Sequence, residues 1–78
     1  MKAYDAVKEV AARSGVSLNS IGREMGKPSN YVSNGASRGS TPKADTLAAM
    51  LAACGWSLMA VPPGSDAPGA IVIDPPAE

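Results

Sequence analysis

LNSIGREMGKPSNYVSNGAS, residues 18–37, decides the fold, because two short helical patterns meet there at a glycine-containing turn. Apolar residues of the first pattern recur at helical spacing, at Leu18, Ile21 and Met25. Ser17 precedes them as a candidate N-cap, since its hydroxyl can accept a hydrogen bond from a free backbone N–H of the first turn. Gly26 ends the pattern and tolerates a left-handed backbone. The spacing predicts a helix over 17–25 followed by a tight turn.

The next pattern, over 29–37, predicts a short third helix with a mostly polar surface. Its mediocre helix formers are Ser29, Asn30, Ser33, Asn34, Gly35 and Ser37. Apolar surface comes only from Tyr31, Val32 and Ala36. We therefore expect this helix to be stable only when other elements pack against it.

Two further helices are expected on either side of this pair. Residues 2–14 carry an apolar stripe of Ala3, Val7, Val10 and Ala11, and Gly15 stops the pattern. A fourth helix leads up to Gly55, with its apolar stripe at Leu47, Met50, Leu51 and Cys54. Thr41 suits the N-cap of that helix and Pro42 its first position, where a missing N–H has no consequence.

The last third of the chain changes character. Apolar runs over 57–61 and 70–73 predict two strands, and the segment 62–69 between them is a loop by its proline and glycine content. A disordered tail beyond Val61 is the alternative. The expected fold class is therefore mainly α: a small four-helix domain with a C-terminal β-strand or hairpin. Residues 1–56 form the domain, and 57–78 form the strand or hairpin and the tail.

The middle of the chain resembles the helix-turn-helix of the phage repressor and Cro family (XRE-type). Five residues stand in register with the pattern of that family: Ile21, Gly22, Gly26, Val32 and Ser33. The resemblance covers roughly residues 3–56 and implies a repressor-like helix-turn-helix domain that inserts helix 29–37 into the DNA major groove. Gly35 and Ala36 depart from the family, which usually has a bulky apolar residue and a Glu there. Either the backbone approaches a neighbour closely at Gly35, or another side chain fills the gap.

The polar residues around the third helix are the candidate DNA contacts. By family position, base edges are contacted by Ser29, Asn30, Ser33 and Asn34. The candidate contacts to the DNA backbone are Ser17, Asn19, Arg23, Lys27, Ser37, Arg38, Ser40, Thr41 and Lys43. Solvation is the alternative for each, and Ser29 is also a candidate helix cap.

The charge distribution favours a polyanionic partner although the net charge is zero. Residues 1–43 hold seven basic and three acidic residues, a net charge of +4, whereas residues 44–78 hold four acidic residues and no basic one, a net charge of −4. A basic front half and an acidic rear half satisfy the electrostatics of DNA binding.

The apolar C-terminal strands and the thin core predict a homodimer. An exposed apolar edge strand is an aggregation hazard unless it is paired, and the same element of a second chain can pair with it. Two third helices about 34 Å apart then contact successive major grooves of a pseudo-palindromic operator. The alternative is a hairpin that folds back over its own helices.

Several classes of function are disfavoured. The chain lacks His, has Cys54 as its only Cys, and shows no metal-ligand spacing, nucleophile motif or phosphate loop, so we expect no enzyme, no metal, no cofactor and no disulfide. No apolar run is long enough for a membrane span, and we expect a cytoplasmic, nucleoid-associated protein encoded by a bacterium or phage. The predicted function is a sequence-specific transcriptional regulator, a repressor. The alternative is an antitoxin-like protein or adaptor that binds a protein partner.

Overall fold

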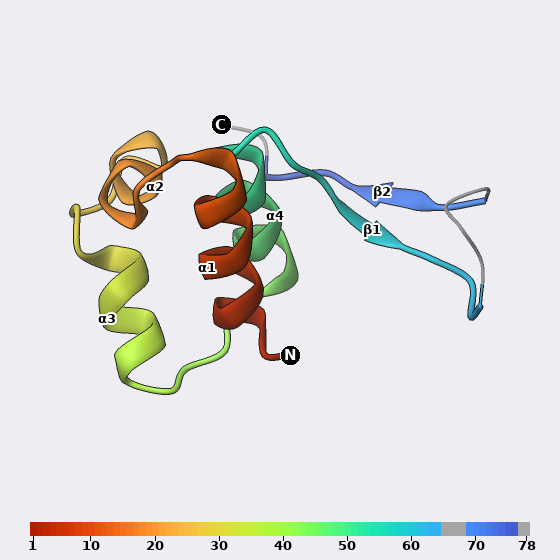
Figure 1. Ribbon diagram of the computed structural model, residues 1–78, viewed down its shortest axis with the longest axis horizontal. Helices are drawn as coiled ribbons and strands as arrows, with labels where there is room; N and C mark the ends of the chain where they lie inside the picture. The colour runs from red at the N-terminus through yellow and green to blue at the C-terminus, as the bar shows by residue number, and fades with distance from the viewer. Residues whose placement is uncertain (65–68, 77–78) are drawn as a thin grey trace.

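The computed structural model describes residues 1–64 and 69–76. Helices and strands follow in the order α1 (Ala3–Ser14), α2 (Leu18–Glu24), α3 (Tyr31–Ser37), α4 (Ala44–Ala52), β1 (Leu58–Ala60) and β2 (Ile71–Ile73) (Figure 1). The expected mainly helical architecture, with four helices and an antiparallel hairpin, is confirmed.

The core is small and aliphatic. Helix α2 packs on α3, and α1 packs on both α3 and α4. The core consists of Val7, Val10, Ala11, Ile21, Val32, Met50 and Leu51. No polar or charged residue is buried among the described residues. Helical spacing therefore predicts most of the core correctly, because each helix presents one apolar stripe inward.

The connection between α1 and α2 has the geometry that its residues favour. Gly15 ends α1 with φ at 68°, and its N–H donates to carbonyl oxygens of the last turn. Ser17 caps α2, because its Oγ accepts from the N–H of Ser20 at 3.1 Å. The predicted N-cap is thus confirmed.

The turn after α2 is held against that helix by its backbone. Gly26 has φ at 71°, the left-handed conformation expected of it. The Lys27 N–H donates to the Gly22 carbonyl at 2.9 Å. A Cβ atom on Gly22 would lie 2.6 Å from the Pro28 carbonyl oxygen, so only glycine fits there. The close neighbour of Gly22 is therefore the backbone of the turn and not α3.

Two helix starts differ from the expectation. Helix α3 begins at Tyr31, whose N–H donates to the Pro28 carbonyl, so Ser29 and Asn30 lie in the preceding turn. Helix α4 begins at Ala44 with Lys43 in the N-cap position. Thr41 as N-cap and Pro42 as first helical residue are therefore wrong. The extended backbone of Lys43, with ψ at 156°, separates Pro42 from the helix.

Helix α4 also ends earlier than its apolar stripe. Ala52 is its last residue, and Cys54 lies in the turn beyond, which closes at Gly55 with φ at 79°. Cys54 is half-buried against the core, and this burial raises the pKa of its thiol. The residue behaves as the small apolar side chain that its sequence context indicates.

The hairpin projects away from the helices, at the opposite end of the molecule from α3 (Figure 1). Leu58 pairs with Ile73, Met59 with Val72 and Ala60 with Ile71. The alternative of a structureless tail beyond Val61 is wrong for β2, while residues 65–68 of the predicted loop lie outside the described residues. Trp56 is 41% exposed at the base of the hairpin and does not belong to the core.

The contact at Gly22 generates a stability prediction. We expect Gly22→Ala to lower the free energy of unfolding by about 2 kcal/mol, because the new methyl group displaces a backbone carbonyl rather than a flexible side chain. Ser20→Ala, on the same helix, should change it by less than about 0.5 kcal/mol. Urea denaturation followed by circular dichroism measures both, and equal effects would contradict the close contact.

Candidate nucleic-acid interface

Helix α3 is two-sided despite its short length. At 3.6 residues per turn, one face carries the polar residues Asn30, Ser33, Asn34 and Ser37. The opposite face carries Tyr31, Val32, Gly35 and Ala36, of which Val32 and Gly35 are buried. Packing holds the helix by its apolar face, so the polar face is directed away from the core.

The structure exposes most of the predicted base contacts. Ser29, Asn30 and Asn34 are exposed, and Ser33 is half-buried. Asn30 occupies the N-cap position, yet its side chain makes no capping hydrogen bond. The N-cap position thus belongs to Asn30 and not to Ser29, which was the candidate cap. Ser29 and Asn30 lie in the turn before α3, and Ser33 and Asn34 lie in the first half of the helix.

Tyr4 is the residue that holds α3 and that helical spacing failed to predict. A Cβ atom on Gly35 would overlap the phenol of Tyr4 and lie 2.6 Å from its Cζ. The ring from α1 therefore occupies the space that the missing side chain at position 35 leaves. Of the two explanations offered for Gly35, the second is therefore correct: another side chain, that of Tyr4, fills the gap. Position 4 lies three residues before Val7 on the α1 stripe, which was the available signal.

The predicted contacts to the DNA backbone are all exposed and lie before, along and after α3: Ser17, Asn19, Arg23, Lys27, Ser37, Arg38, Ser40, Thr41 and Lys43. Two of their hydroxyls already have partners. Ser17 accepts from Ser20, and Ser40 donates its hydroxyl proton to the Gly35 carbonyl at 2.9 Å. These two side chains are therefore less available to a ligand than the sequence suggests.

The cations are distributed at both ends of α3. Arg23 and Lys27 precede it and Arg38 follows it. The Lys27 ammonium lies 5.7 Å from the centre of the Tyr31 ring, a cation–π distance that places its charge beside the start of α3. In contrast, Arg13 is paired with Glu9 at 3.1 Å on α1, so its charge is locally balanced.

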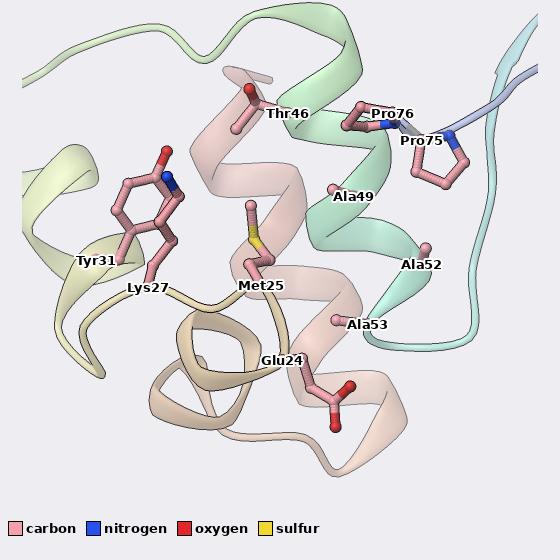
Figure 2. A pocket seen from close by; sticks show the side chains of 10 residues that line it. All are labelled: Glu24, Met25, Lys27, Tyr31, Thr46, Ala49, Ala52, Ala53, Pro75 and Pro76. Carbon is pink, nitrogen blue, oxygen red and sulfur yellow. The ribbon is translucent and has the colours of Figure 1, made fainter. Parts of the chain in front are cut away.

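A groove of about 510 Å³ runs beside this region (Figure 2). One wall is the segment from Glu24 to Tyr31, and the other is α4 with Thr46, Ala49 and Ala52, followed by its C-cap Ala53. Pro75 and Pro76 close its far end, where the chain returns from the hairpin to α4. No sequence pattern predicts this groove, because Pro75 and Pro76 reach α4 only through the hairpin.

Among the described residues, no three His, Cys, Asp or Glu side chains gather as ligands for a metal ion. No helix of the described part is long and apolar enough to cross a bilayer. No model of a known protein family, no curated protein and no solved structure matches the chain.

The packing of Tyr4 on Gly35 predicts that the effect of Gly35→Ala on stability reverses its sign when Tyr4 is replaced. We expect Gly35→Ala to destabilise the protein by about 1 kcal/mol, because the methyl group overlaps the ring. With Tyr4→Leu as the background, Gly35→Ala should instead stabilise it by about 1 kcal/mol through helix propensity. Denaturation of the four proteins completes the double-mutant cycle. The same effect in both backgrounds would show that the ring does not contact α3.

Proposed function

We propose that this protein is a sequence-specific DNA-binding transcriptional regulator of the helix-turn-helix kind, a repressor that inserts α3 into the major groove. The observation that carries the proposal is the polar face of α3, directed outward by the glycine turn and by Tyr4. Short polar side chains on such a face can hydrogen-bond base edges, and asparagine can bond adenine through two atoms.

The charges support the same assignment. Arg23 and Lys27 precede α3 in the chain and Arg38 follows it, and cations that flank a recognition helix can contact the phosphates beside a groove. Among the described residues of the second half of the chain, the acidic side chains are Asp45 in the first turn of α4 and Asp74 after β2, and neither is on α3. A polyanion is therefore attracted to the cations before and after α3 rather than to that half.

Exposed apolar residues support a homodimer as the DNA-binding form. In β2, Ile71 is 68% exposed, Val72 48% and Ile73 36%, and in β1 Met59 is 45% exposed. Adjacent strand residues point to opposite faces, so both faces of the hairpin are apolar and open. The alternative of a hairpin folded back over its own helices does not fit this exposure. A second copy is the partner we propose for it.

DNA binding can be tested by fluorescence anisotropy with a selected operator, a random duplex and a salt series. Asn30→Ala should weaken operator binding by about 1–3 kcal/mol and leave the random duplex nearly unchanged, because a base contact is lost. Lys27→Ala should weaken both duplexes equally and reduce the salt slope by about 1, because a phosphate contact is lost.

The matched control is Arg13→Ala, which removes a charge that Glu9 already balances. Arg13→Ala should leave the preference for the operator over the random duplex unchanged. It should change the salt slope much less than Lys27→Ala does. Failure of the unmodified protein to bind any duplex at low salt would refute the proposal. An antitoxin-like or adaptor function would then be the one to test.

The role of the hairpin is tested without DNA. We expect Val72→Lys to abolish the dimer while the fold is retained, because an exposed site accepts a charge in the monomer but not in an apolar interface. Ala12→Lys, at an exposed position on α1, is the control and should dimerise normally. Sedimentation velocity measures the change, and a monomeric unmodified protein at tens of micromolar would contradict the dimer.

A further inference from the structure

We propose that Lys2 and Lys8 are further contacts to the DNA backbone, and that they hold the strand that passes the C-terminal end of α3. This inference rests on the proposed DNA-binding function. It adds a second wall, on α1, to the backbone contacts predicted for the loop after α3.

The two lysines line a cleft of about 530 Å³ between the start of α1 and the loop after α3. Lys2 and Lys8 lie on the α1 side, and Ser40 and Thr41 lie on the loop side. Figure 1 shows the start of α1 and this loop at the same end of the helical domain. The cleft therefore brings two cations of α1 opposite a loop that already carries candidate phosphate contacts.

The contact between Tyr4 and Gly35 fixes this cleft relative to α3. The Tyr4 ring occupies the space beside Gly35, and α1 packs on α3. Lys8 follows Tyr4 by four residues, a spacing that places both on one face of a helix, so Lys8 lies one turn beyond the ring. The carbonyl of Lys2 accepts from the Ala6 N–H at 3.0 Å, which ties the backbone of Lys2 to α1. Both lysines are thus attached to the same packed unit as α3.

Lys2 and Lys8 are also the cations to which no other interaction gives a role. Of the seven basic residues, four are candidate backbone contacts and Arg13 is paired with Glu9. Both remaining lysines are exposed, and within residues 1–64 and 69–76 neither forms an ion pair or a side-chain hydrogen bond. The hydroxyl of Thr41 likewise has no hydrogen-bond partner in that part of the chain, so it can donate to a phosphate.

The candidate contacts form a continuous path from α3 to the cleft. Ser37 ends α3, Arg38 is its C-cap, and Ser40 and Thr41 follow in the loop. A strand that leaves the major groove past this end of α3 meets the loop first and the opposite wall of the cleft next. The two lysines outnumber Asp5, the acidic residue of the lining, so the cleft attracts a phosphodiester.

The first experiment measures the salt slope for Lys2→Ala and Lys8→Ala by fluorescence anisotropy with a random duplex. We expect each to reduce the slope by about 1, because each removes one phosphate contact. Both should keep the fold, since Lys8 is exposed and the Lys2 side chain makes no capping hydrogen bond. Asp5→Asn should have the opposite effect and tighten binding, because repulsion of the phosphates is lost. Arg13→Ala, on the same helix, is the control and should leave the slope nearly unchanged.

The second experiment locates the contact on the duplex. A variant with both Lys2→Ala and Lys8→Ala should bind an operator with long flanks about tenfold more weakly than the unmodified protein at low salt. On an operator shortened to the base pairs that α3 covers, the two proteins should bind equally, because the flanking phosphates are absent. Equal weakening on both duplexes would overturn the proposal.

The outcomes separate this inference from the proposed function. Unchanged slopes for Lys2→Ala and Lys8→Ala, beside a reduced slope for Lys27→Ala, would overturn the α1 contacts and leave the proposed function standing. An unmodified protein that binds no duplex at low salt would refute both.

Discussion

The close approach of the Pro28 carbonyl to Gly22 is the constraint on which the rest of the structure depends. With 2.6 Å between that oxygen and the place of a Cβ atom, no other residue allows the turn to fold against α2. The Lys27 N–H to Gly22 carbonyl hydrogen bond and the left-handed Gly26 hold the same turn. Because α3 begins only three residues after Pro28, this contact fixes where the helix starts and in which direction it leaves.

Once its start is fixed, α3 depends on tertiary packing for its helical state. Serine, asparagine and glycine are poor helix formers, and seven residues make too short a helix to persist alone. Val32 and the contact of Gly35 with Tyr4 supply the stabilisation from one side. The polar side is therefore free of any packing role. Residues on the polar side can therefore vary without loss of core packing. A helix that contacts base edges needs such a surface.

The sequence predicted those features that depend on local chemistry. Ser17 as a cap, Gly26 in the left-handed turn and the apolar stripes of the helices follow from neighbours in the chain, and they were correct except that Cys54 of the α4 stripe lies beyond the end of the helix. The features that depend on distant residues were missed or misplaced. Tyr4 meets Gly35 across 31 positions, and Pro75 reaches α4 only after the hairpin has turned back. The start of α4 was misplaced because Lys43 adopts an extended backbone that no residue type dictates.

The exposure of the candidate contact residues was predicted better than the availability of their hydroxyl groups. All thirteen candidate contacts are outside the core, yet the hydroxyls of Ser17 and Ser40 already have hydrogen-bond partners within the chain. These bonds tie Ser17 to the first turn of α2 and Ser40 to the Gly35 carbonyl, so both hydroxyls contribute to the fold. Serine side chains therefore stabilise the fold at the edges of the site, whereas the polar side chains along α3 face away from the core.

Placing the polar face and the apolar hairpin at opposite ends has a physical consequence for assembly. Either surface can be covered without competing for the residues of the other, so association of two copies would leave both α3 helices accessible. The small aliphatic core gives the domain only modest stability. Burial of the hairpin between two copies would remove from water apolar area that the single chain exposes. In the proposed dimer, two polar faces held in one assembly would bind a paired site more tightly than either face alone, through effective concentration.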